Sequence, residues 1–277
     1  MIRGIYMMKK IEYSKWKDDH RSILESLNDK KILFGFSGGR DSSLALDFIQ
    51  RAKKDFGFDF EAHAGAFPIH RYPKTEKERI GSYWSARDVD IIWHNFIETD
   101  DMIRNADNPC HSCQMIRKKL LKTIVMQEIN NIENLVLIVN YTLWDIVGYS
   151  LEHILSDIFS DFNKKRNIDK SERFRETAQR FYPLLQVKKG YTIFRPIVKL
   201  NGCDILYTIE KMGIPILSIQ CDFKEYRPKR ILERYYEKMG LEFDYNNVFE
   251  FAKKALKLPD ISEYISIDKE KYLEEVF

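Results

Sequence analysis

Short apolar runs alternate with longer segments of helical periodicity through most of the chain. Five such runs lie at residues 32–36, 60–67, 89–93, 135–139 and 214–219. Runs of this length between helix-like segments are typical of strands in a parallel sheet that helices cover on both faces. The pattern therefore predicts an α/β fold with an open, five-stranded parallel sheet.

Helix-like patterns flank this alternating region on both sides. At residues 1–30 the apolar positions, which include Trp16 and Leu27, recur at helical spacing among charged residues. The same spacing recurs in the last third of the chain. We therefore expect an N-terminal helical lead-in over residues 1–30, an α/β catalytic domain over residues 31–222 and a C-terminal helical extension over residues 223–277.

Composition narrows the class of protein. The 277 residues are 44% hydrophobic, which is enough apolar content to bury a core. With 45 basic and 42 acidic residues the formal charge is +3, which permits an RNA partner without requiring one. No apolar run reaches the roughly 20 residues that a membrane-spanning helix needs, and the N-terminus lacks a signal-peptide core. We therefore expect a cytoplasmic protein that does not attach to a membrane.

A polar, glycine-containing loop follows the first predicted strand directly and precedes a helical pattern. Its sequence is Ser37-Gly38-Gly39-Arg40-Asp41-Ser42. Two adjacent glycines let backbone N–H groups approach a phosphate, and the serine hydroxyls and the helix N-terminus add further attraction for an anion. A carboxylate at Asp41 is compatible with phosphate oxygens if a Mg²⁺ ion lies between them. The loop therefore predicts a phosphate site, although such residues also form ordinary turns and helix caps.

This hexapeptide resembles the Ser-Gly-Gly-x-Asp-Ser signature of the PP-loop ATP pyrophosphatase superfamily. Its members cleave ATP to AMP and pyrophosphate while they adenylate a carbonyl oxygen or a carboxylate. The resemblance implies a Rossmann-like, adenine nucleotide alpha hydrolase-like fold that binds ATP and Mg²⁺. The variable position is often lysine, and Arg40 keeps the charge but changes its geometry. The implied nucleotide-binding residues are Ser37, Gly38, Gly39, Arg40, Asp41 and Ser42.

The cysteines point to a second kind of chemistry. Cys110 and Cys113 form a Cys-x-x-Cys pair ahead of a helical pattern, and Cys221 follows the last predicted strand. Because the carboxyl ends of parallel strands meet at one edge, all three should lie near the phosphate loop. A Cys-x-x-Cys pair with a distant third cysteine fits an iron–sulfur cluster, or a zinc site that another ligand completes. We expect Cys203 to be an ordinary buried thiol.

Further segments resemble the iron–sulfur-dependent tRNA 2-thiolation enzymes, the 2-thiocytidine and 2-thiouridine synthetases. The resemblance is scattered over roughly residues 30–235 and rests on the phosphate loop, on residues 110–118, 183–185 and 194–196, and on Cys221. It implies an ATP-dependent sulfurtransferase that adenylates a carbonyl oxygen of a tRNA base and replaces that oxygen with sulfur. It also implies a 4Fe–4S cluster held by the three cysteines, Cys110, Cys113 and Cys221.

Three more polar residues are candidates for this site. Relatives carry Gly-His-Asn-x-Asp-Asp after the fourth strand, whereas residues 140–145 read Asn-Tyr-Thr-Leu-Trp-Asp, so that only Asp145 inherits a catalytic or Mg²⁺-binding role. The alternative for Asp145 is a helix cap. Arg117 lies one helical turn past Cys113 and is expected to contact phosphate or AMP, unless it is a solvated helix arginine. Arg195 is expected either to bind phosphate or to support the fold through an ion pair.

Two other functions remain open from the sequence. The first is an amide-forming or nitrile-forming PP-loop ligase with zinc on the cysteines. The second is a non-catalytic RNA-binding module that uses the basic segment between Lys164 and Arg180 as its phosphate-contacting surface. The sequence also leaves open whether the sulfur donor is inorganic sulfide or a persulfide carrier, and whether the chain forms a homodimer.

Overall fold

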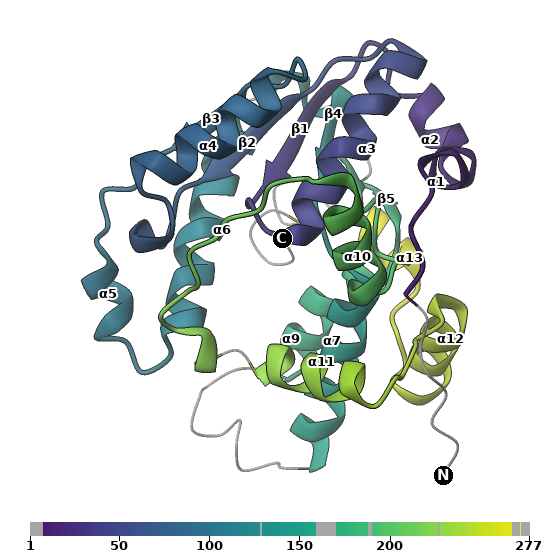
Figure 1. The fold of residues 1–277 in the computed structure, drawn as a ribbon. Coiled ribbons are helices and arrows are strands. Elements are labelled where there is room, and N and C mark those ends of the chain that lie inside the picture. The colour runs from purple at the N-terminus through teal and green to yellow at the C-terminus, as the bar shows by residue number, and fades with distance from the viewer. Residues whose placement is uncertain are drawn as a thin grey trace.

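The computed structural model describes residues 8–127, 129–158, 170–187, 190–226, 228–267 and 272. Within these residues six strands form one sheet in the order β3-β2-β1-β4-β6-β5 (Figure 1). The strands are β1 Lys31–Phe36, β2 Glu61–Gly65, β3 Ile91–His94, β4 Leu135–Ile138, β5 Leu184–Gln186 and β6 Thr192–Phe194. All neighbouring pairs are parallel except β5 and β6, which are antiparallel. The α/β fold with a mainly parallel sheet is therefore confirmed.

Helices lie on both faces of the sheet (Figure 1). The α-helices of the described residues are α1 Tyr13–Asp19, α2 Arg21–Glu25, α3 Arg40–Phe56, α4 Lys74–Ser85, α5 Asp100–Arg104, α6 Pro109–Gln127, α7 Leu143–Ile158, α9 Lys170–Ala178, α10 Gly202–Met212, α11 Pro228–Lys238, α12 Tyr245–Ala255 and α13 Ile261–Ile265. Among the described residues, none of these helices is both long and apolar enough to cross a membrane.

Two hydrophobic cores lie on opposite faces of the sheet because successive strand side chains point in opposite directions. Phe34 and Phe36 of β1 pack in the first core, which α1, α2, α3, α4 and α10 cover. Leu33 of the same strand packs in the second core, which α6, α7, α12 and α13 cover. The central strand β1 is thus buried on both faces, and it delivers the loop that follows it to a fixed place at the sheet edge.

One predicted strand is wrong. Residues 214–219 contain no strand; they follow α10 as an irregular segment along the carboxyl edge of the sheet. The place beside β4 belongs instead to β6, which forms a hairpin with β5. Each strand of this hairpin has only three residues, which is too short to give a recognisable alternation in the sequence. The described sheet therefore has six strands rather than five.

The segments at both ends of the chain are helical where the structure describes them. Trp16 of α1 is buried in the first core, and its indole N–H donates a hydrogen bond to the carbonyl oxygen of Pro196 at 2.8 Å. Ala252 of α12 and Tyr264 of α13 are buried in the second core. Residues 1–7 and most residues after 267 lie outside the described part of the chain.

Candidate functional site

The phosphate loop, residues 37–42, joins the end of β1 to the start of α3. The hydroxyl oxygens of Ser37 and Ser42 lie 3.0 Å apart, and the Ser42 hydroxyl donates to the carbonyl of Gly39 at 3.1 Å. These bonds close the turn on itself. Gly39 is the N-cap residue of α3 and has no side chain to cap the helix, so that a bound anion can take that role.

Position 38 requires a glycine for two reasons: its backbone conformation and the close approach of a neighbouring side chain. Its φ is +65°, in the left-handed region that favours glycine. A Cβ at this position would lie 2.8 Å from Cγ of Leu217. The N–H of Leu217 also donates to the carbonyl oxygen of Gly38 at 2.8 Å. The irregular segment after α10 therefore packs directly against the phosphate loop.

We expect Gly38→Ala to destabilise the protein more than Gly57→Ala does, and urea unfolding measures the difference. Gly57 also has a positive φ, +79°, but a Cβ there meets nothing within 4 Å. Both variants lose roughly 1 kcal/mol to backbone strain. Gly38→Ala adds the collision with Leu217, worth roughly 1–3 kcal/mol more. Equal losses in the two variants would show that the Leu217 contact does not constrain the loop.

The guanidinium of Arg40 is directed toward carboxylates. Its Nε donates to Oδ1 of Asp41 at 3.1 Å, and its Nη2 donates to Oε1 of Glu233 on α11. Oε1 of Glu237 lies 4.0 Å from Nη1. Burial lowers the pKa of Arg40, but the carboxylates of Asp41 and Glu233 outweigh burial and raise that pKa above its ordinary value. Glu233 was not expected from the sequence, because α11 carries many charges and nothing local distinguishes Glu233 from the others.

The edge segment, residues 214–223, starts beside the phosphate loop and is held there by α4. The N–H of Ser218 donates to Oε2 of Glu76 at 2.9 Å, and Nη2 of Arg79 donates to the carbonyl of Ile216 at 2.7 Å. Arg79 also donates two hydrogen bonds to the Glu76 carboxylate. One ion pair on α4 therefore holds the backbone on both sides of Leu217.

The same segment is held further along by residues that follow β2. Arg71 Nε donates to the carbonyl of Ile219 at 3.1 Å, and the N–H of Asp222 donates to Nε2 of His70 at 3.2 Å. Asp100 accepts from Nδ1 of His70 at 2.7 Å, which fixes the histidine tautomer with Nε2 as the acceptor. These bonds fix the backbone on both sides of Cys221.

The hydrogen bonds to Glu76 predict a pH-dependent contribution to stability. Arg79 is the main cause that lowers the pKa of Glu76 from 4.5 to about 2, with the Ser218 N–H contributing. A lowered carboxyl pKa stabilises the fold above about pH 4.5, and this contribution disappears as the pH falls toward 2. Thermal unfolding should therefore show Glu76→Gln less stable than wild type near neutral pH, with the gap closing below about pH 4.5. A gap that does not change with pH would contradict this assignment.

Three of the four cysteines lie in one small apolar cluster. Cys113 is buried, with 7% of its surface exposed, and packs with Phe67 and Phe223; Cys110 and Cys221 are partly buried against the same group. The Cys110 thiol donates to the carbonyl oxygen of Phe223 at 3.5 Å. Phe67 follows β2, so the cluster lies at the same carboxyl edge of the sheet as the phosphate loop.

The thiols are neighbours but do not form a ready ligand set. All four cysteines are free thiols, and Cys203 lies separately on α10 with partial exposure. Within the described ranges, no group of three or more histidine, cysteine, aspartate or glutamate side chains is arranged to hold a metal ion. The structure therefore brings together the three cysteines that the sequence singled out, without a preformed metal geometry.

Asp145 has the helix-cap arrangement that was its structural alternative, whereas Arg195 is held, among the described residues, by hydrogen bonds to neutral groups rather than by an ion pair. Asp145 lies in the first turn of α7, and its Oδ2 accepts from the N–H of Thr142 at 2.9 Å and from the Thr142 hydroxyl at 3.1 Å, as a capping residue does. Arg195 is 2% exposed and donates to the carbonyl of Tyr182 and to Oε1 of Gln179. Burial lowers the pKa of Arg195. This placement supports a role in the fold rather than contact with phosphate.

Arg117 and the basic segment have different surroundings. Arg117 is half-buried on α6, and its side chain makes no ion pair or hydrogen bond with the residues that the structure describes. Residues 159–169, which include Lys164, lie outside the described part of the chain. Arg173 is bound to Glu152 and Glu176, and Arg180 is also bound to Glu176. Arg173 and Arg180 are therefore engaged within the protein, whereas Arg175 is exposed.

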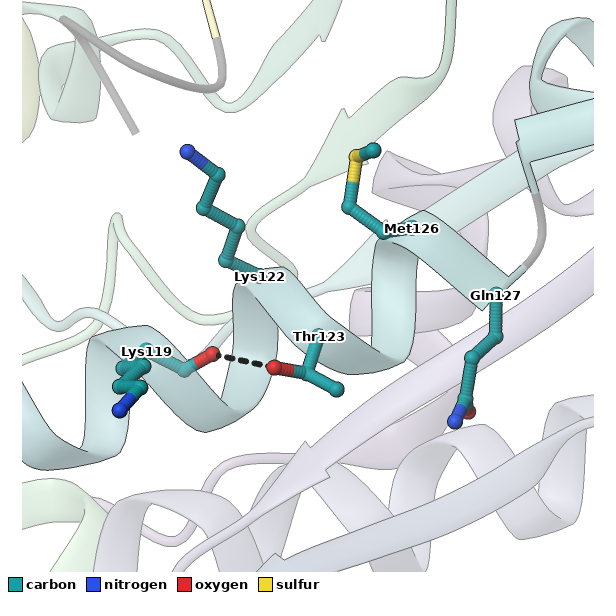
Figure 2. A pocket seen from close by; sticks show the side chains of 5 residues that line it. All are labelled: Lys119, Lys122, Thr123, Met126 and Gln127. Atoms are coloured by element: carbon teal, nitrogen blue, oxygen red, sulfur yellow. Dashed lines mark hydrogen bonds between the residues drawn. The ribbon is translucent and has the colours of Figure 1, made fainter.

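A shallow pocket lies on the outer face of α6, toward the end away from the cysteines (Figure 2). Its lining residues are Lys119, Lys122, Thr123, Met126 and Gln127. The Thr123 hydroxyl donates to the carbonyl of Lys119 at 3.0 Å. None of the candidate residues named above lines this pocket, so we do not include it in the site.

Comparison with known proteins supports the fold. No protein-family model matches the sequence, and no curated protein matches it. The structure is similar to that of the U34-tRNA thiolase NcsA from Methanococcus maripaludis, solved with its 4Fe–4S cluster, with 14% identity and a TM-score of 0.56 over 94% of this chain and 85% of that chain. It also matches the NH3-dependent NAD synthetase from Campylobacter jejuni, with 14% identity and a TM-score of 0.44 over 94% of this chain and 100% of that chain. The thiolase comparison confirms the adenine nucleotide alpha hydrolase-like fold that the PP-loop resemblance implied.

Proposed function

We propose that this protein is an ATP-dependent, AMP-forming sulfurtransferase that replaces a carbonyl oxygen of a tRNA base with sulfur in the cytoplasm. One observation carries the proposal. The edge segment contacts Gly38 of the phosphate loop through Leu217 and reaches the cysteine cluster four residues later, at Cys221. A nucleotide on the loop and a sulfur-handling group on the cysteines would thus share one edge of the sheet.

The first half of the reaction belongs to the phosphate loop. The backbone N–H groups at the start of α3 and the hydroxyls of Ser37 and Ser42 bind the ATP phosphates, and Asp41 holds Mg²⁺. The carbonyl oxygen of the base attacks the α-phosphorus, so that a new P–O bond forms while the bond to pyrophosphate breaks. The oxygen, now bonded to AMP, has become a good leaving group. Sulfide then attacks the carbon, AMP departs, and loss of the sulfur-bound proton leaves a C=S bond. With a persulfide carrier as the donor, attack would leave a C–S–S linkage, and a thiol reductant would have to cleave its S–S bond to release the thiolated base.

The cysteine cluster can support the second half of the reaction, in which sulfur replaces AMP. Thiolates are the usual protein ligands of iron–sulfur clusters, and three of them from two separate segments lie among phenylalanines that exclude water. Cys110, Cys113 and Cys221 would hold a 4Fe–4S cluster, as the similar thiolase holds one. When bound, such a cluster supplies a Lewis-acidic iron that presents sulfur as a nucleophile.

Anaerobic purification followed by two measurements tests this proposal. Iron and acid-labile sulfide should each approach about four per chain. Labelled ATP, with tRNA and sulfide, should give AMP and pyrophosphate rather than ADP. A colourless, zinc-containing protein that still forms AMP would favour the amide-forming or nitrile-forming ligase. RNA binding without any AMP release would favour the non-catalytic module.

A further inference from the structure

A buried ion pair joins the phosphate loop to helix α11, which belongs to the C-terminal part of the chain. Glu233 of α11 is 4% exposed and accepts from Nη2 of Arg40, a residue 193 positions earlier in the chain. A buried charge is costly unless a partner neutralises it and hydrogen bonds satisfy it. Arg40 is therefore the reason that Glu233 can be buried, and the pair fixes how α11 sits against the loop.

A third element shapes this contact. Gly202 is the first residue of α10, and a Cβ at that position would lie 2.6 Å from Nη2 of Arg40 and 2.7 Å from Oε1 of Glu233. Any larger residue would collide with both partners of the ion pair. Because Gly202 has no side chain, the guanidinium of Arg40 and the carboxylate of Glu233 fill the space beside it together. This packing keeps the guanidinium oriented toward Glu233.

The other side of the same guanidinium reaches Asp41. Nε of Arg40 donates to Oδ1 of Asp41 at 3.1 Å, while Nη2 is bound to Glu233. A planar guanidinium can hold two carboxylates in fixed relative directions, which the single ammonium of lysine cannot do. The direction of the Asp41 carboxylate therefore depends on Arg40, and the direction of Arg40 depends on Glu233.

We infer that Arg40 is a positioning residue through which α11 orients Asp41 for Mg²⁺, so that α11 sets the affinity for Mg²⁺-bound ATP. This inference rests on the proposed use of ATP at the phosphate loop. It changes the role expected for Arg40 from direct phosphate binding to support of a metal ligand. It also makes Glu233, outside the α/β domain, a part of the nucleotide site.

The test is ATP binding by calorimetry, with Mg²⁺ and then with EDTA in its place, in three single variants. Glu233→Gln keeps the shape of the side chain and removes its charge. Arg40→Lys keeps the positive charge but removes the planar group that contacts Asp41 and Glu233 at the same time. Each should weaken Mg²⁺-dependent ATP binding roughly 10–100-fold, as loss of a residue that supports a metal ligand commonly does. Binding in EDTA should not change, because Asp41 acts through the metal. Glu242→Gln, which changes an exposed glutamate that follows α11, is the matched control and should behave as wild type.

Each contrary result has a distinct meaning. If Glu233→Gln lowers the melting temperature but leaves Mg²⁺-dependent ATP affinity unchanged, the ion pair is only structural and the inference is wrong. If affinity falls equally with and without Mg²⁺, the pair shapes the whole loop rather than Asp41, and the inference is again wrong. Should Glu233→Gln fail to fold, Arg40→Lys decides by the same criteria. Wild-type protein that binds no ATP would overturn the proposed function together with this inference.

Discussion

Asp41→Ala is expected to lower AMP formation by roughly 100-fold to 1,000-fold, the usual cost of losing one electrostatic contact to the developing charge of a transition state. Asp41 is the carboxylate of the phosphate loop, and Mg²⁺ bound there would neutralise charge on the ATP phosphates during attack. Iron content should stay at the wild-type level because the cysteine cluster is formed by other residues. Release of labelled AMP and iron analysis of the same preparation measure both effects.

Asp55→Ala provides the matched control for this variant. Asp55 lies on the same helix, α3, but at its far end, where it accepts hydrogen bonds from Tyr13 and Lys17. Its removal deletes an aspartate of the helix without touching the phosphate loop, so AMP formation should not change. If Asp41→Ala and Asp55→Ala form AMP at the same rate, Asp41 has no part in the chemistry.

Cys113→Ala should give the opposite result, with loss of iron and retention of ATP binding. Cys113 is the most buried thiol of the cluster, and its removal leaves only two candidate sulfur ligands there. Two thiolates are too few for a stable 4Fe–4S cluster, so iron and acid-labile sulfide should fall to near background. Sulfur transfer should disappear with them, while Mg²⁺-dependent ATP binding stays at the wild-type level.

Cys203→Ala is the control for that experiment. It removes a thiol of partial exposure from α10, away from the cluster, and should retain full iron content. Unchanged iron in Cys113→Ala, or equal iron loss in both variants, would refute the ligand assignment.

Local patterns predicted the centre of the fold well. The strand at β1, the glycine turn and the helix α3 are consecutive in sequence, and each carries its own signal: an apolar run, paired glycines and a helical repeat. The apolar run at residues 214–219 was wrongly predicted to be a strand, because six mostly apolar residues give the same pattern in a strand and in an irregular segment packed along a sheet edge. The difference lies in distant partners such as Gly38 and Glu76, which no local pattern reveals.

The candidate site was also predictable only in part, because local sequence patterns do not reveal contacts between distant residues. Sheet geometry correctly placed Cys221 near the phosphate loop, although the residue arrives there on an irregular segment held by His70 and Arg71 rather than at a strand end. Arg195 and Asp145 could not be resolved from residue type alone, because an arginine or an aspartate serves the fold as readily as a ligand. The structure adds their surroundings, which are hydrogen bonds to neighbouring backbone and side-chain groups.

The contact between Leu217 and Gly38 has a consequence for biosynthesis. The loop that would hold ATP, residues 37–42, is made early in translation, whereas Leu217, which packs against it, is made much later. A nascent chain that ends before residue 217 therefore has the glycines but not the support that holds them in place.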